Sequence, residues 1–188
     1  MPRLPTVTGM TAHLDPDLAE ARFRAVFSHL RAVTAYARRR GSADADAIAA
    51  EAMTIAWRRL ADVPQDDPLP WLYATARNLV LADARRSSRR TVLREPEQTA
   101  PAPSRPALDP QLERALRSLR PLDREALLLV AWEDLTPTQA ARTLGLSPTA
   151  FRVRLLRARR RLRASLDAVA ADDARRPAHL VHLDVEGT

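Results

Sequence analysis

The sequence contains neither cysteine nor lysine among its 188 residues, and aromatic residues make up only 4% of it. The absence of cysteine excludes disulfide frameworks, thiolate metal sites and thiol nucleophiles, and it fits a reducing compartment. Alternating β-branched runs are also missing, which disfavours pleated sheets, whereas the abundant alanine, leucine and arginine favour helices. We therefore expect an all-α protein.

Segments for export or for crossing a membrane are missing as well. The longest strongly apolar stretch, residues 126–132, is far too short to cross a bilayer, and residues 1–14 lack the apolar core of a signal peptide. We therefore predict a cytoplasmic protein that does not insert into a membrane.

The formal net charge of +7 rests on arginine alone, because all 30 basic residues are arginines. A guanidinium group binds phosphates and guanine edges in a bidentate manner, so this excess suggests an anionic partner. A GC-rich coding bias would also raise the arginine content, but throughout the chain. The positions of the arginines must decide between the two explanations.

Prolines divide the chain into two small helical domains. The first should hold three helices, over residues 16–40, 42–62 and 70–90, with Ser42 capping the second and a proline-rich loop before the third. The spacing of charged, apolar and proline residues predicts a tail (1–13), a first domain (14–91), a proline-rich linker (92–108), a second domain (109–168) and a C-terminal tail (169–188).

The second domain contains the signals of a helix-turn-helix. Asp123 is predicted to cap a helix with a buried apolar block, and Thr136 with Gln139 forms a capping box for the next helix. Gly145 should end that helix in a left-handed turn, and Ser147 should cap the last one. This spacing is typical of DNA-binding helix-turn-helix domains.

The last helix should separate an apolar face from a basic one. Phe151, Leu155, Ala158 and Leu162 recur at helical spacing and are expected to face inward. Residues 152–163 contain seven arginines and no acid, whereas a merely solvated helix would interleave acids at i+4. DNA binding is therefore favoured over solvation, although Arg154 could instead brace the domain.

Two motifs, in the expected order, resemble the extracytoplasmic-function class of sigma subunits of bacterial RNA polymerase. The segment LRPLDREALLLVAWEDLTPTQAARTLGLSPTAFRVRLLRARRRL is similar to sigma region 4. The segments DADAIAAEAMTIAWRRL and PWLYATARNLVLADARR are similar to the polymerase-binding and promoter-melting helices of region 2. The resemblance covers about residues 18–90 and 112–166, and it implies a three-helix region 2 joined to a helix-turn-helix region 4.

The resemblance also implies partners and site residues. Contacts with the clamp of the polymerase's largest subunit would come from Asp44, Asp46, Glu51 and Arg58, although Ala47 and Ala50 replace polar residues that the family usually has. The −10 promoter element would be bound by Arg77, Asn78, Arg85, Arg86, Arg89 and Arg90, and the −35 element by Thr149, Ala150, Arg152, Val153 and Arg157. The loop of residues 62–69 would receive a flipped base, and an anti-sigma factor is a possible further partner.

Other functions remain as alternatives. An autonomous regulator could use the same helix-turn-helix without polymerase. A small enzyme acting on nucleic acid is disfavoured, since no P-loop, paired-carboxylate cluster or deaminase zinc signature is present. His179, His182 and Asp184 form only a weak metal signal. We therefore predict no catalytic site, metal or cofactor.

Overall fold

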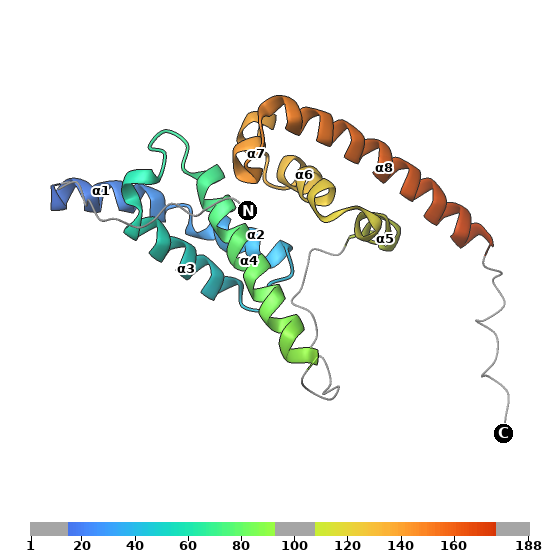
Figure 1. The fold of residues 1–188 in the computed structure, drawn as a ribbon, viewed down its shortest axis with the longest axis horizontal. Coiled ribbons are helices and arrows are strands. Elements are labelled where there is room, and N and C mark those ends of the chain that lie inside the picture. The colour runs from blue at the N-terminus through green and yellow to red at the C-terminus, as the bar shows by residue number, and fades with distance from the viewer. Residues whose placement is uncertain (1–14, 93–107, 176–188) are drawn as a thin grey trace, which may run out of the picture. The chain divides into compact units, whose positions relative to one another are not determined.

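The computed structural model describes residues 15–92 and 108–175, and within these two ranges it contains helices and no strands (Figure 1). The chain forms two compact units, Met1–Glu95 and Pro96–Thr188. The predicted fold class, two small helical domains, is confirmed. The N-terminal tail, residues 176–188 of the predicted C-terminal tail, almost all of the predicted linker and the weak histidine signal lie outside the described residues, so the predicted domain boundaries stay predictions.

In residues 15–92, the described part of the first unit, there are four α-helices and one short 3-10 helix. These are α1 (Pro16–Phe27), α2 (Leu30–Arg39), α3 (Ala45–Arg58), η1 (Leu60–Asp62) and α4 (Leu69–Val92). Helices α2, α3 and α4 pack against one another, and α1 packs against α3. At the centre, the fully buried ring of Tyr36 stacks on Tyr73, with ring centroids 4.9 Å apart.

Two details of the first unit differ from the prediction. The predicted helix 16–40 is interrupted at Ser28 and His29, where the Ser28 Oγ donates to the carbonyl of Ala25 at 2.7 Å. The prediction of Ser42 as a cap was wrong, because Asp44 caps α3 by accepting a hydrogen bond from the Ala47 N–H at 2.9 Å. Ser42 is instead buried.

Residues 108–175, which are described for the second unit, contain four helices, of which the last is the longest. These are α5 (Pro110–Ser118), α6 (Pro121–Ala131), α7 (Pro137–Leu144) and α8 (Pro148–Arg175). Each of α5, α6 and α7 packs against α8, which is drawn in orange to red in Figure 1. The fully buried Phe151 and Leu129 are among the largest side chains of this core. None of the helices in the described part of the chain is long and apolar enough to span a membrane.

The start of α6 corrects another predicted cap. Arg120 occupies the N-cap position and Pro121 the first helical position, so Asp123 lies one turn inside the helix. A proline at this first position fits, since the N–H that it lacks would have no intrahelical partner. The carboxylate of Asp123 is buried, and it serves a different purpose, described below.

The turn between α7 and α8 agrees with the prediction. Thr136 and Gln139 form the capping box of α7, and Gly145 ends that helix in the left-handed region at φ 65° and ψ 34°. Ser147 then caps α8, because its Oγ accepts a hydrogen bond from the Ala150 N–H at 3.1 Å. These local signals build the helix-turn-helix.

Replacing Gly145 with alanine should destabilise the second unit by roughly 1–2 kcal/mol, because an L-residue with a Cβ is strained in the left-handed region. No atom lies within 4 Å of the position that this Cβ would occupy, so steric overlap adds nothing. Denaturant unfolding monitored by circular dichroism measures the change. Gly145→Asn is the matched control and should lose less stability, since asparagine tolerates this conformation. An alanine variant as stable as the original protein would contradict the reasoning.

Candidate nucleic-acid interface

The first turns of α8 separate a buried face from an exposed one. Phe151, Leu155 and Ala158 are buried, as their spacing predicted, and Leu162 is half-buried. All five residues predicted to read the −35 element have exposed side chains: Thr149, Ala150, Arg152, Val153 and Arg157. Two apolar side chains of α8 are exposed as well, Val153 at 43% and Leu156 at 51%.

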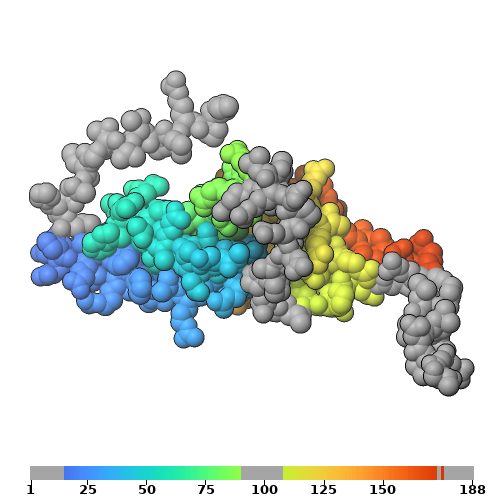
Figure 2. Space-filling model, turned by 90° about the horizontal axis from the view of Figure 1, so that it is seen from below, coloured from blue at the N-terminus to red at the C-terminus, as the bar shows by residue number. Residues whose placement is uncertain are grey.

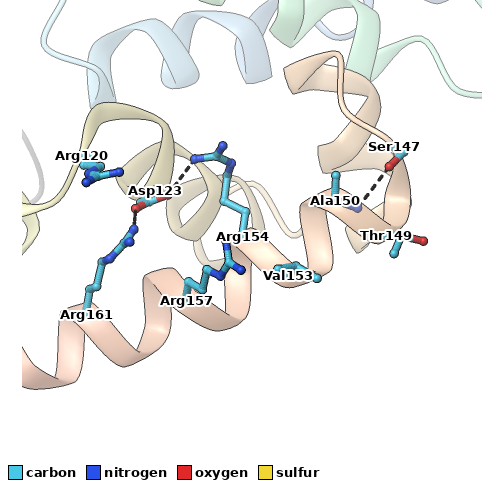
Figure 3. A pocket seen from close by; sticks show the side chains of 9 residues that line it. All are labelled: Arg120, Asp123, Ser147, Thr149, Ala150, Val153, Arg154, Arg157 and Arg161. Carbon is cyan, nitrogen blue, oxygen red and sulfur yellow. Dashed lines mark hydrogen bonds and ion pairs between the residues drawn. The ribbon is translucent and has the colours of Figure 1, made fainter.

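A cavity of about 530 Å³ opens beside this exposed face. Figure 3 shows the residues that line it: Arg120, Asp123, Ser147, Thr149, Ala150, Val153, Arg154, Arg157 and Arg161. Four of the five predicted −35 residues thus lie on one concave surface, which the starts of α6 and α8 form together. Arg152 is exposed but does not line the cavity.

Asp123 anchors two arginines of α8 from within α6. Its side chain is 2% exposed, and its Oδ1 accepts a hydrogen bond from the Arg154 Nη1 at 2.8 Å. Its Oδ2 binds the Arg161 Nη1. Sequence reasoning missed this role, because the two partners are 31 and 38 residues away. The alternative prediction that Arg154 braces the domain is confirmed.

The remaining arginines of this stretch point toward solvent. Arg152, Arg157 and Arg160 are exposed, and none of them is paired with a carboxylate in the two described ranges. Unpaired guanidinium groups on one surface create the positive potential that attracts a phosphate backbone. The basic face predicted from the sequence is therefore present, with Arg154 and Arg161 set apart from it.

The residues predicted to bind the −10 element lie along α4 in the first unit. Asn78, Arg85 and Arg89 have exposed side chains, and their spacing of seven and four residues places them on one face of the helix. Arg86 is also exposed and lies 3.8 Å from Asp83, whereas Arg77 is half-buried. The backbone of Arg90 continues the same helix.

The residues predicted to contact polymerase lie on α3 and at its start. Asp44, Glu51 and Arg58 are exposed and recur every seven residues, so they share one face. Asp46 points elsewhere, since its Oδ2 lies 4.0 Å from the Arg38 Nη2 of α2. The N-cap hydrogen bond of Asp44 gives that residue a structural role as well.

Aromatic side chains of the first unit differ in their exposure. Tyr73 is buried, and Trp71 is half-buried. Trp57 is 49% exposed and contacts Phe23 edge to face, with ring centroids 5.0 Å apart. Phe27, 46% exposed, lies beside Phe23.

The loop after η1 is fastened to α1. The Arg22 Nη2 donates to the carbonyl of Val63 at 2.7 Å, and Val63 itself is buried. Arg59 holds the preceding turn by binding Asp62 at 2.8 Å, and its guanidinium lies 5.8 Å from the ring centroid of Trp71. The first residues of the loop predicted to receive a base, Asp62 and Val63, are thus held in place by Arg59 and Arg22. In the described part of the chain, no cluster of three or more potential metal ligands occurs.

Comparisons with known proteins match both units. The family model for sigma-70 region 2 matches residues 26–90, and that for sigma-70, region 4, matches residues 110–162. A probable RNA polymerase sigma factor, RfaY, of Xanthomonas campestris pv. campestris is 39% identical over 140 residues. That match covers 68% of this chain but only 35% of the relative's length.

Two solved structures have a similar fold. The sigma factor RpoE, in complex with the anti-sigma factor NepR from Bartonella quintana, is 24% identical with a TM-score of 0.57, and the match covers 77% of this chain and 95% of that one. CnrH, in complex with the cytosolic domain of CnrY, is 26% identical with a TM-score of 0.54, covering 79% and 90%. The described helix-turn-helix and the three-helix packing of α2, α3 and α4 fall inside the family matches.

Proposed function

Because the chain belongs to the sigma-70 family of RNA polymerase sigma factors, we propose that it acts as a transcription initiation factor of the extracytoplasmic-function type. It binds core RNA polymerase in the cytoplasm, directs it to specific promoters and melts the −10 element, with no catalytic site of its own. One observation carries the proposal: regions 2 and 4 match separately, in the order that a sigma factor requires.

The second unit recognises the −35 element in this proposal. The first turns of α8 enter the major groove, where Thr149, Ala150 and Val153 meet base edges and Arg152 and Arg157 meet guanines or phosphates. The exposure of all five side chains and the unpaired charge of the two arginines support this assignment.

The first unit binds the −10 element and the polymerase clamp. The face of α4 that carries Asn78, Arg85 and Arg89 follows the DNA backbone, with Asn78 as the residue that reads a base, and Arg77, Arg86 and Arg90 add further contacts. A flipped base enters the loop that Arg22 fastens to α1, and unstacking it costs only a few kcal/mol. Asp44, Asp46, Glu51 and Arg58 of α3 contact the clamp.

An anti-sigma factor is the proposed regulatory partner. The support is that RpoE, which has a similar fold, was solved in complex with the anti-sigma factor NepR. An amphipathic segment that covered DNA-binding or polymerase-binding surfaces would keep the factor inactive until it was released.

A reconstitution experiment tests the proposed function. The purified chain is mixed with sigma-free core polymerase, sized by gel filtration, and assayed for run-off transcription on fragmented DNA from the source genome. We expect co-elution and discrete transcripts. Specific DNA binding by the free chain without co-elution would instead favour an autonomous helix-turn-helix regulator.

Replacing Arg157 with alanine should weaken promoter binding by the holoenzyme by about 1–3 kcal/mol, because a bidentate contact to a base is worth this amount. Filter binding on a promoter found in the run-off assay, and on variants of it mutated in the −35 element, measures the change. Arg175→Ala is the matched control on the same helix and should have little effect, since Arg175 is exposed and far from the cavity. Equal weakening on every sequence would show a phosphate contact instead of base reading.

A further inference from the structure

The geometry around Asp123 points to a residue that limits sequence-independent DNA binding without touching DNA. We propose that Asp123 withholds Arg154 and Arg161 from the DNA backbone, and so keeps sequence-independent binding by the second unit weak. This inference deepens the proposed function and rests on it, because it assumes that α8 faces DNA.

The contacts place both arginines on the same carboxylate. Arg154 and Arg161 are seven residues apart on α8, so they project from the same face two turns apart. Figure 3 shows both side chains pointing toward Asp123, and each binds a different oxygen. Their side chains remain 32% and 45% exposed, so they lie at the edge of the cavity and not in the core.

Burial makes this arrangement obligatory for the carboxylate. Asp123 is 1% exposed, and a buried charge without a partner is strongly unfavourable. The carboxylate therefore keeps both ion pairs, and Arg154 and Arg161 stay bound to it. An arginine on the neighbouring position, Arg160, has no such partner among the described residues and is free to reach a phosphate.

The consequence for DNA binding follows from what phosphate contacts do. Phosphate contacts add affinity for any sequence and carry no sequence information directly. Arg154 and Arg161 line the cavity beside Thr149 and Val153, so both would reach the backbone next to the base-reading residues if they were released. Holding them on Asp123 therefore weakens binding to any DNA sequence, so that contacts with base edges supply a larger share of the affinity for a promoter.

The test uses the full chain and a non-promoter duplex, and measures binding by fluorescence anisotropy between 0.05 and 0.5 M salt, a range chosen around physiological ionic strength, about 0.15 M. Asp123→Asn removes the charge and keeps the shape. We expect the slope of log affinity against log salt to become steeper by about 0.9 for each arginine that gains a phosphate, which corresponds to about eightfold tighter binding at 0.1 M salt per contact. Circular dichroism shows whether the variant is folded.

A second variant does not depend on the folding of the first. Arg161→Gln should leave the salt slope unchanged, because Arg161 makes no phosphate contact. If Arg161→Gln makes the slope shallower by about 0.9, or if a folded Asp123→Asn variant has an unchanged slope, the proposal is overturned.

Failure of this inference can be told apart from failure of the proposed function. The salt slopes are measured on the free chain without polymerase, whereas the proposed function depends on co-elution with core polymerase and on run-off transcripts. A chain that does not bind polymerase yet shows the expected slopes would keep the role of Asp123 and lose the sigma-factor assignment.

Discussion

Replacing Phe151 with alanine should destabilise the second unit by about 3–5 kcal/mol, the usual cost of truncating a fully buried aromatic side chain. Phe151 has no exposed surface and lies on α8, the helix against which α5, α6 and α7 pack. Its loss would leave a cavity directly beneath the residues that we assign to the −35 element. Promoter binding should therefore fall together with stability.

The second unit carries its own optical probe for this measurement. The sequence has three tryptophans, and Trp132 is the one in the second unit, so Trp57→Phe and Trp71→Phe leave it as the sole reporter. Leu156→Ala is the matched control, because Leu156 is 51% exposed on the same helix and should cost little. Equal losses for the two variants would contradict the packing described for α8.

Replacing Tyr36 with alanine should destabilise the first unit by a similar amount, about 3–5 kcal/mol. The Tyr36 ring is fully buried, stacks on Tyr73, and lies 3.9 Å below the guanidinium of Arg40. Its removal takes away contacts with α4 and at the end of α2 at once. Calorimetry of the full chain measures the shift of the unfolding transition.

The control for this variant is Phe27→Ala in the same unit. Phe27 is 46% exposed, so its truncation should cost far less than that of Tyr36. Because the two units are compact by themselves, we expect the transition reported by Trp132 to stay in place in both variants. A shift of that transition equal to the shift of the first unit would show that the units unfold as one.

Features fixed by neighbouring residues were predictable from the sequence. The capping box of Thr136 and Gln139, the left-handed Gly145 and the Ser147 cap each involve residues at most a few positions apart. The apolar spacing of α8 likewise predicted which side chains are buried. The resemblance to sigma-70 regions 2 and 4, which rested on two motifs, is confirmed by the two family matches.

Features fixed by distant residues were not predictable. The interruption at Ser28 and His29 has no proline or glycine to mark it, and it arises where α1 packs on α3 while α2 packs on both α3 and α4. Trp57 lies in an apolar stretch, yet its neighbours leave half of it exposed. The spacing of apolar residues predicts which side of a helix is apolar. It does not predict which other helix packs against each side chain.

The candidate site was predictable to a similar extent. The exposed basic face of α8 followed from the absence of acids within residues 152–163. The acid that binds two of these arginines, Asp123, comes from α6. Because Asp123 lies near the start of a helix, its sequence context is that of a helix cap. The roles assigned to individual residues of α3, α4 and α8 stay predictions until they are tested by substitution.

The continuity of α8 gives the second unit a mechanical property. The helix runs without interruption from the cavity past Ser165, whose hydroxyl is hydrogen-bonded to that of Ser118 at the end of α5. Ala150 and Ser165 are 15 residues apart, which corresponds to about 22 Å at 1.5 Å per residue. The helix is thus a stiff rod that joins the residues we assign to the −35 element to the contact with α5. A displacement of α5 would move those residues without any contact with a base.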